Sequence, residues 1–188
     1  MDKPSYNEIR SLVLKELEVS LGSIKEEEVE KLINIVLNSE KVFFVGVGRV
    51  MLSLQAVAKR WAHIGIDTHI VGEITEPAIT SRDLLIVGSG SGTTLFPAAI
   101  AKKAHQIGAK VVHIGSNPNS GLKDIVEFMV RIPVRTKYYL EDEIDSLQPM
   151  TSLFEQSVLL LGDIIAKMII DRKKLDMKEL WQFHANLE

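Results

Sequence analysis

The sequence contains no cysteine, which excludes disulfide bonds, thiolate chemistry and cysteine-based metal sites. The longest run of lysine and arginine is the three residues at 172–174 and the formal net charge is −3, so a nucleic-acid-binding surface is not expected. No apolar run is long enough to span a membrane, and the amphipathic, acidic N-terminus has no signal-peptide core. We therefore expect a cytoplasmic protein that binds neither nucleic acid nor membrane.

Histidine is also sparse: the five residues are scattered, and no pair has the spacing of a metal site. No metal site is predicted. His69 and His105 are expected to serve structure or solvent, and His113, in the middle of a predicted strand, is expected to be a packed residue. The 188 residues, 46% hydrophobic and 25% charged, are typical of one globular domain with a substantial core. The sequence predicts a single domain over 1–188, with N-terminal helices over 1–38 and a helical C-terminal tail over 173–188.

The most informative segment is rich in glycine and hydroxyl groups. The apolar run at 84–87 is followed by GSGSGTT at 88–94, and apolar residues then recur at helical spacing as far as Ile107. Glycines let the backbone approach a ligand, and the free N–H groups of a helix start favour a bound anion. Ser89, Ser91 and Thr94 add hydroxyl donors without charge, so the segment predicts a neutral cradle for phosphate.

A strand–helix turn of this composition can also close without any ligand. The segment is not a Walker A motif, because no Gly-Lys-Ser/Thr follows, and it lacks the spacing of the dinucleotide fingerprint. A hydroxyl at every second position, converging on a helix start, favours phosphate binding. A monophosphate fits better than a nucleotide.

Strand and helix patterns alternate along the chain. Apolar spacing predicts two N-terminal helices between Tyr6 and Asn38, broken near Gly22, with Ser23 and Glu26 in capping-box form. Strands are predicted at 41–45, 67–71, 84–87, 110–114 and 128–132, and helices at 51–64, 97–107, 152–170 and about 176–183. This alternation is typical of an α/β fold: a three-layer α-β-α sandwich, Rossmann-like, around a five-stranded, mostly parallel sheet.

Three glycine-rich or polar segments follow the ends of predicted strands, at 46–49, 88–94 and 116–119. In a parallel sheet, ligands bind beyond the carboxyl ends of the strands. We therefore expect the three segments to lie close together and to form one site.

These segments resemble the signatures of the sugar isomerase (SIS) domain: GVGR at 46–49, GSGSGTT at 88–94 and SNP at 116–118. Four more segments are similar to the 6-phospho-3-hexuloisomerase family: RWAHIG at 60–65, VGEITEPAI at 71–79, SLQPMTSLFEQ at 146–156 and HANLE at 184–188. The resemblance runs from about Phe43 to the C-terminus and includes a helical N-terminus as in that family.

The resemblance implies an isomerase that interconverts 3-hexulose 6-phosphate and fructose 6-phosphate in the ribulose monophosphate pathway, without a metal or organic cofactor. It also implies a homo-oligomer, a tetramer or a dimer, with sites at subunit contacts. The alternatives are another phosphosugar aldose–ketose isomerase and a non-catalytic phosphosugar-binding protein. Regulators of the latter kind usually carry a helix-turn-helix domain, for which this chain has no room.

Moving a carbonyl between neighbouring carbons needs a base for a carbon-bound proton and a group that serves the two oxygens. The resemblance makes Glu155, at the start of the longest apolar helix, the candidate base; a first-turn Glu favoured by the helix dipole is the alternative. By the same resemblance His63 and His184 are candidate acid–base or ring-opening groups. The alternative for His63 is a structural role near the end of a helix, where an imidazolium suits the helix dipole. The alternative for His184 is a place in a flexible C-terminal tail.

Arg49 follows Gly48 at the end of the first strand and is predicted to contact substrate oxygens or phosphate; a surface Arg bridging two loops is the alternative. The predicted binding residues are Gly48, Arg49, Ser89, Gly90, Ser91, Thr93, Thr94, Ser116 and Asn117. Two positions depart from the family pattern, since Val50 stands where Ser is usual and Thr93 where Glu is usual. Both departures leave the cradle and the candidate base in place and bear on which sugar phosphate is bound.

Overall fold

The computed structural model describes residues 3–187, and its strands form one parallel sheet. The strands are β1 (Val42–Val45), β2 (Thr68–Ile70), β3 (Leu84–Gly88), β4 (Lys110–Gly115) and β5 (Phe128–Arg131). Their order is β2-β1-β3-β4-β5, and every neighbouring pair is parallel. The predicted α/β fold with a five-stranded sheet is confirmed.

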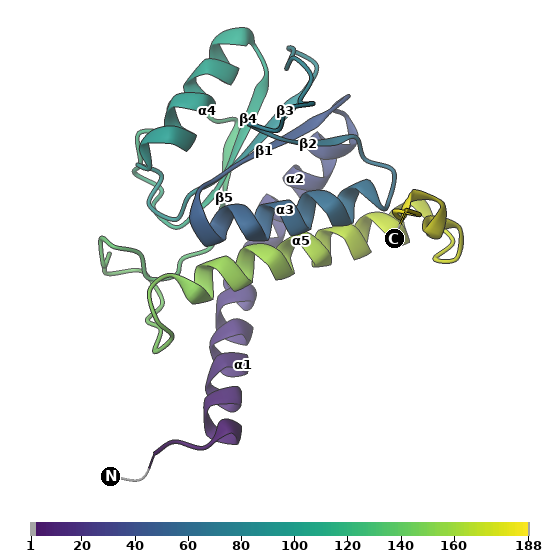
Figure 1. Ribbon diagram of the computed structural model, residues 1–188. Coiled ribbons are helices and arrows are strands. Elements are labelled where there is room, and N and C mark those ends of the chain that lie inside the picture. Colours follow the sequence, from purple (N-terminus) through teal and green to yellow (C-terminus); the bar gives the residue numbers. More distant parts are fainter. Residues whose placement is uncertain (1–2, 188) are drawn as a thin grey trace.

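Helices cover both faces of this sheet. They are α1 (Tyr6–Gly22), α2 (Glu26–Leu37), α3 (Gly48–Ala62), α4 (Leu95–Ile107), α5 (Ser152–Lys173) and the short 3₁₀ helix η1 (Glu179–Phe183). Helix α4 lies on one face, and α2, α3 and α5 lie on the other (Figure 1). The result is the predicted sandwich of three layers.

Alternate residues of the strands point to opposite faces and build two cores. Phe44 and Ile86 belong to the larger core with α2, α3 and α5, whereas Phe43 and Leu85 pack with α4. All four side chains are essentially inaccessible to solvent. Burial on both faces explains why these strands read as continuous apolar runs in the sequence.

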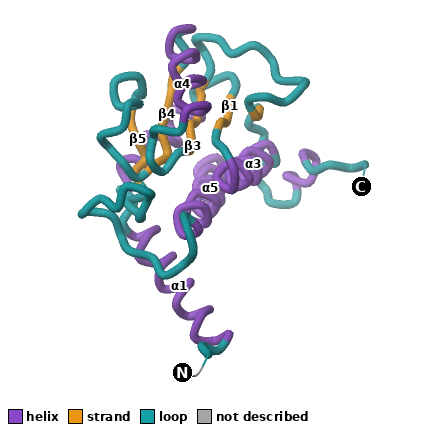
Figure 2. Tube along the Cα trace, turned by 60° about the vertical axis from the view of Figure 1, so that its left-hand side comes forward, coloured by secondary structure: helices purple, strands orange, loops and turns teal. Residues whose placement is uncertain are grey.

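Helices α3 and α5 lie side by side (Figure 2) and begin at the same end of the molecule (Figure 1). The close contact requires a glycine, because a Cβ on Gly162 of α5 would lie only 2.1 Å from a methyl carbon of Val57 on α3. Nearby, the indole N–H of Trp61 donates to the Gly162 carbonyl over 2.9 Å. These contacts hold the C-terminal half of α3 against the middle of α5.

The break between α1 and α2 is where the sequence predicts it, but the predicted capping box is wrong. The Ser23 hydroxyl donates to the Ser20 carbonyl over 2.6 Å, and α2 has Lys25 as its N-cap. A capping box occurs instead at the start of α1, between Ser5 and Glu8. Ser23 is therefore satisfied by the helix that precedes it.

The N-terminal part of α1 projects away from the body of the molecule (Figure 1). Its last turn is anchored on α5, where the hydroxyls of Ser20 and Ser157 lie 2.8 Å apart and both residues are buried. Further out, Glu16 accepts hydrogen bonds from the Ser146 hydroxyl at 2.6 Å and the Leu147 N–H at 2.8 Å. Across residues 3–187, no helix is long and apolar enough to cross a bilayer.

Candidate active site

The three segments at the strand ends lie together, as the topology predicts. The Gly90 carbonyl accepts the N–H groups of Ser116 and Asn117 at 2.9 and 3.0 Å. On the other side, a Cβ on Gly46 would lie 3.3 Å from the Gly88 carbonyl oxygen. The segment 88–94 therefore sits between the ends of β1 and β4.

The turn within 88–94 depends on Gly92. Its φ is +64°, and a Cβ there would lie 2.4 Å from the Ser120 side chain, so both conformation and space require glycine. The Gly92 N–H donates to the Ser89 hydroxyl at 3.1 Å, and the Ser89 and Thr94 hydroxyls lie 3.2 Å apart. The turn thereby brings both hydroxyls to the start of α4.

His113, on β4, stabilises this turn through a hydrogen bond to its backbone. The residue is 1% exposed, and its Nε2 lies 2.7 Å from the Ser89 carbonyl oxygen. Burial lowers the pKa of His113, since a charged ring would lose its hydration; the hydrogen bond to Ser89 opposes this only partly. A neutral ring that carries its proton on Nε2 donates to that carbonyl, so the sequence prediction of a packed histidine agrees with its position.

A cavity of about 290 Å³ opens at this edge of the sheet. Seven of the residues predicted to bind substrate or act on it lie in its wall: Gly48, Arg49, Ser89, Gly90, Ser91, Thr94 and Glu155. Val50 and Phe154 contribute apolar surface. Chain segments that are far apart in the sequence thus form one compartment with hydroxyl groups, a carboxylate and a guanidinium.

Glu155 and Arg49 face each other in this cavity. The Arg49 Nε donates to Glu155 Oε2, and the Thr151 hydroxyl donates to Oε1 over 2.8 Å. The Glu155 side chain is 8% exposed, whereas that of Arg49 is 66% exposed. Ser53 adds a hydrogen bond of 2.8 Å to the Glu155 carbonyl and so ties α3 to the first turn of α5. The carboxylate is held in place, while the guanidinium can move toward solvent or a ligand.

Three predicted binding residues lie outside the cavity wall, and their side chains have other partners. Ser116 is fully buried and donates to Glu143 over 2.9 Å. The Thr93 hydroxyl lies 2.7 Å from the Tyr138 hydroxyl and donates to the Ser91 hydroxyl over 3.2 Å. Asn117, also outside the wall, donates from its side chain to the Ser91 carbonyl at 3.3 Å. Their positions favour a supporting role for all three.

Sequence reasoning missed three polar residues of the cavity wall: Thr136, Lys137 and Thr151. The first two come from the irregular segment after β5, which has neither periodicity nor a glycine-rich pattern. Thr151 stands immediately before α5, and its place as the N-cap of a helix that carries the candidate base was the available signal. Lys137 adds a cation to the cavity wall beside the cradle, which was not predicted from the sequence.

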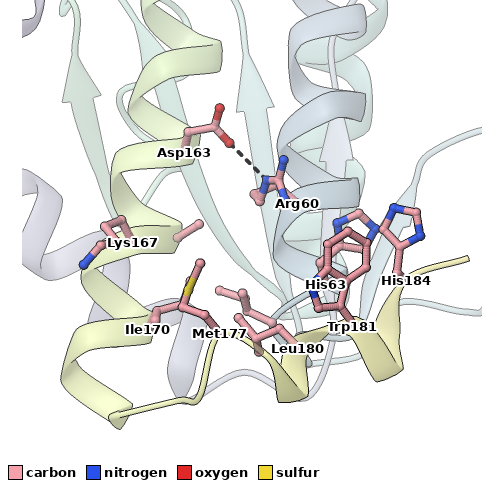
Figure 3. A pocket seen from close by; sticks show the side chains of 11 residues that line it. Arg60, His63, Asp163, Lys167, Ile170, Met177, Leu180, Trp181 and His184 are labelled. Atoms are coloured by element: carbon pink, nitrogen blue, oxygen red, sulfur yellow. Dashed lines mark ion pairs between the residues drawn. The ribbon is translucent and has the colours of Figure 1, made fainter.

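His63 and His184 lie elsewhere. They line a second cavity of about 330 Å³ between α3, α5 and η1, and their rings stack with centroids 5.0 Å apart (Figure 3). Helix α3 begins at Gly48 in the first cavity and ends beside His63, roughly 22 Å away for 15 residues at 1.5 Å each. The structure therefore brings the two histidines together but not to Glu155 of the same chain.

Among residues 3–187, no group of three or more acidic or histidine side chains could hold a metal ion. The chemistry of the first cavity is that of a carboxylate, cations and hydroxyl groups. Such groups suit a reaction that moves a proton on a phosphorylated substrate.

No protein-family model matches the chain. It is 36% identical over 176 residues to a 3-hexulose-6-phosphate isomerase of Bacillus subtilis, a match that covers 94% of this chain and 95% of the relative. The chain belongs to the 3-hexulose-6-phosphate isomerase family. A second family member, from Mycobacterium gastri, is 35% identical over 95% of this chain and 89% of its own length.

A solved structure shares the fold along nearly the whole chain. The protein from Methanococcus jannaschii, for which a molecular function of 3-hexulose-6-phosphate isomerase was inferred, superposes with a TM-score of 0.81 and is 28% identical. The match covers 96% of this chain and 99% of that one. Family membership and fold thus agree with the resemblance seen in the sequence.

Proposed function

We propose that the protein isomerises 3-hexulose 6-phosphate to fructose 6-phosphate, the activity for which its Bacillus subtilis and Mycobacterium gastri relatives are named. The observation that carries the proposal is the buried Glu155 carboxylate, which shares one cavity with Arg49 and the hydroxyl cradle. A base, a cation and an anion cradle are what this isomerisation needs.

The cradle of Ser89, Ser91 and Thr94 binds the phosphate group in this proposal. Thr94 is the N-cap of α4, and no side chain among the described residues caps that helix. The first N–H groups of α4 and its dipole are therefore available to an anion. Anchoring the phosphate leaves the opposite end of the sugar free to approach Glu155.

Glu155 then moves the proton between two carbons. Its carboxylate removes the proton from C2 of the 3-hexulose, and the C–H electrons form a C2–C3 double bond while the C3 carbonyl oxygen takes up negative charge. The proton returns to C3, the C2 oxygen becomes the carbonyl and loses its proton, and the C3 oxygen gains one. No atom is gained or lost, so neither a redox partner nor a co-substrate is required.

Arg49 stabilises the charge that develops on the two oxygens. Its guanidinium already lies against Glu155 and is mostly exposed, so it can form hydrogen bonds with an enediolate without crossing the cavity. A donor placed at developing negative charge typically lowers the barrier by on the order of 3 kcal/mol.

We further propose that His63 and His184 act in the site of a neighbouring subunit, in a homo-oligomer that is a dimer or a tetramer. Within one chain these rings lie at the far end of α3 from Glu155, and the projecting part of α1 exposes apolar residues such as Tyr6 and Leu14. Because a charged sugar phosphate does not cross a bilayer readily, we propose that the enzyme meets its substrate in the cytoplasm.

Mixing two inactive variants tests the shared site. Glu155→Gln would be unfolded and refolded at equal amounts with a variant in which both His63 and His184 are alanine. If sites combine residues from two chains, about a quarter of the wild-type activity returns, because half of the pairs are mixed and each mixed pair has one intact site. No recovery, or a monomer by light scattering, would contradict the proposal.

A substrate panel tests the activity itself. Wild-type protein would be assayed against 3-hexulose 6-phosphate and a series of other ketose and aldose phosphates, with unphosphorylated fructose as the control. We expect turnover of 3-hexulose 6-phosphate with the highest kcat/KM of the series. Binding of phosphosugars without turnover of any of them would indicate a sensor and overturn the proposal.

A further inference from the structure

The segment after β5 contributes a cation to the cavity. The ionisable side chains in the cavity wall are Arg49, Glu155 and Lys137. Arg49 and Glu155 form an ion pair, so their charges offset each other. The Lys137 Nζ lies over the Tyr138 ring, 5.2 Å from its centroid, and among residues 3–187 no carboxylate forms an ion pair with it. One uncompensated positive charge therefore belongs to this wall.

Hydrogen bonds hold the chain on both sides of Lys137. Glu143 accepts the N–H and hydroxyl of Thr136, before the lysine, both at 2.9 Å, and the N–H of Leu140, after it, at 3.0 Å. The side-chain hydroxyl of Tyr138 lies 2.7 Å from the Thr93 hydroxyl of the cradle segment. The backbone position of Lys137 is thus fixed by the cradle segment and by the hydrogen bonds of the Glu143 carboxylate.

The same segment touches the cradle directly. A Cβ on Gly90 would lie 3.2 Å from the methyl carbon of Thr136, so the residue next to Lys137 packs against the backbone of the turn. A sugar phosphate carries a charge of about −1.5 to −2 at neutral pH. Hydroxyl and amide donors alone leave that charge unbalanced, whereas an unpaired ammonium group in the same wall offsets part of it.

We propose that Lys137 is the phosphate-binding cation of this cavity and selects phosphorylated over unphosphorylated ketoses. This inference rests on the proposed function, because it assigns the phosphate end of the same substrate. The lysine binds a group that does not react, so its contribution is equal in the ground state and the transition state. It is a specificity-determining residue, distinct from the groups that move the proton.

The test compares Lys137→Met with Lys137→Arg, and uses Lys103→Met as a matched control, since Lys103 is an exposed lysine of α4 outside both cavities. We expect Lys137→Met to raise KM for 3-hexulose 6-phosphate roughly 10- to 100-fold with kcat within about twofold of wild type. Lys137→Arg keeps the charge and retains most of the affinity. Lys103→Met leaves both constants unchanged.

A binding measurement separates this inference from the proposed function. Affinity for inorganic phosphate, measured by calorimetry, needs no turnover and should fall by a similar factor in Lys137→Met. Unchanged phosphate affinity or an unchanged KM in this variant would overturn the role of Lys137. If the wild type bound phosphate but isomerised no hexulose phosphate, the proposed activity would be wrong. A loss of phosphate affinity in Lys137→Met would still support Lys137 as the phosphate-binding cation.

Discussion

Arg49 and Glu155, 106 residues apart in the sequence, form an ion pair where α3 and α5 begin. The pair exists because the two helices start at the same end of the sheet and pack closely along their length (Figure 1). Its two members differ in freedom: the carboxylate is buried and has Thr151 as a second partner, whereas the guanidinium is largely exposed. The packing therefore holds the Glu155 carboxylate in place and leaves the Arg49 guanidinium free to move.

Replacement of Arg49 tests the role of the cation. We expect Arg49→Gln to lower kcat by about 10²- to 10³-fold, because the enediolate oxygens lose a charged donor, while KM changes less. Arg82→Gln is the matched control, since it breaks an exposed arginine–glutamate pair, with Glu40, away from the cavity. Equal kinetics for Arg49→Gln and wild type would exclude Arg49 from the reaction.

The buried ring of His113 gives a stability prediction with a definite pH window. Burial lowers the pKa of His113. Between the folded and the unfolded pKa, the histidine is therefore protonated in the unfolded chain but neutral in the folded protein. Stability therefore falls as the pH drops below about 6.5, the unfolded value, and this component levels off at the lower folded pKa. His113→Phe should lose this dependence and cost about 1–3 kcal/mol, since the Ser89 carbonyl loses its donor. Urea unfolding at several pH values, with exposed His105→Phe as control, measures both effects; an unchanged pH profile would contradict the assignment.

Asp83 gives a second, more acidic window. Burial raises the pKa of Asp83, but hydrogen bonds from Thr80 and the contacts with Lys41 outweigh it and hold the value below normal. The stability that this carboxylate contributes is present above about pH 3.9 and is lost as the pH falls through the lower folded pKa. Asp83→Asn should destabilise the protein at neutral pH by about 1–3 kcal/mol and flatten the acid limb of the stability profile.

The control for Asp83 is Asp171, an exposed carboxylate paired with Lys167 on α5. Asp171→Asn should change the unfolding free energy by at most about 0.5 kcal/mol. If the two variants behaved alike, burial and hydrogen bonding would not explain the contribution of Asp83.

Gly162 tests the packing that brings the two helices together. A Cβ on this residue would lie 2.1 Å from Val57, so Gly162→Ala should destabilise the protein by about 1–3 kcal/mol through overpacking. Adding Val57→Ala removes the clashing methyl groups and should restore part of the loss. Thermal unfolding of the two single variants and the double variant measures the coupling, and strictly additive effects would contradict the contact.

The sequence predicts most of the fold because the strands are buried on both faces. Apolar runs at 84–87 and 110–114 place β3 and β4 to within a residue. The start of α3 is less predictable: the helix begins at Gly48, three residues before the predicted start, because a glycine with φ of +57° opens it. A helix propensity argument penalises glycine at that point, whereas the turn requires it.

The site is predictable only where residues follow a strand or begin a helix. Ser89, Thr94, Arg49 and Glu155 occupy such positions, and the topology of a parallel sheet brings them into one cavity. Lys137 and Thr136 stand in an irregular segment whose path depends on the hydrogen bonds of Glu143, and no local pattern reports such a path. The distance of His63 and His184 from Glu155 likewise follows from tertiary packing, which spacing along the chain does not reveal.

The kinetics of Glu155→Gln test the central claim most directly. The amide keeps the shape of the side chain and can accept from Thr151, but it cannot remove a proton from carbon. With 3-hexulose 6-phosphate as substrate, turnover should fall by about 10²- to 10⁴-fold, while calorimetry shows fructose 6-phosphate bound nearly as tightly as by wild type. Turnover within tenfold of wild type would show that another group moves the proton and would contradict the account.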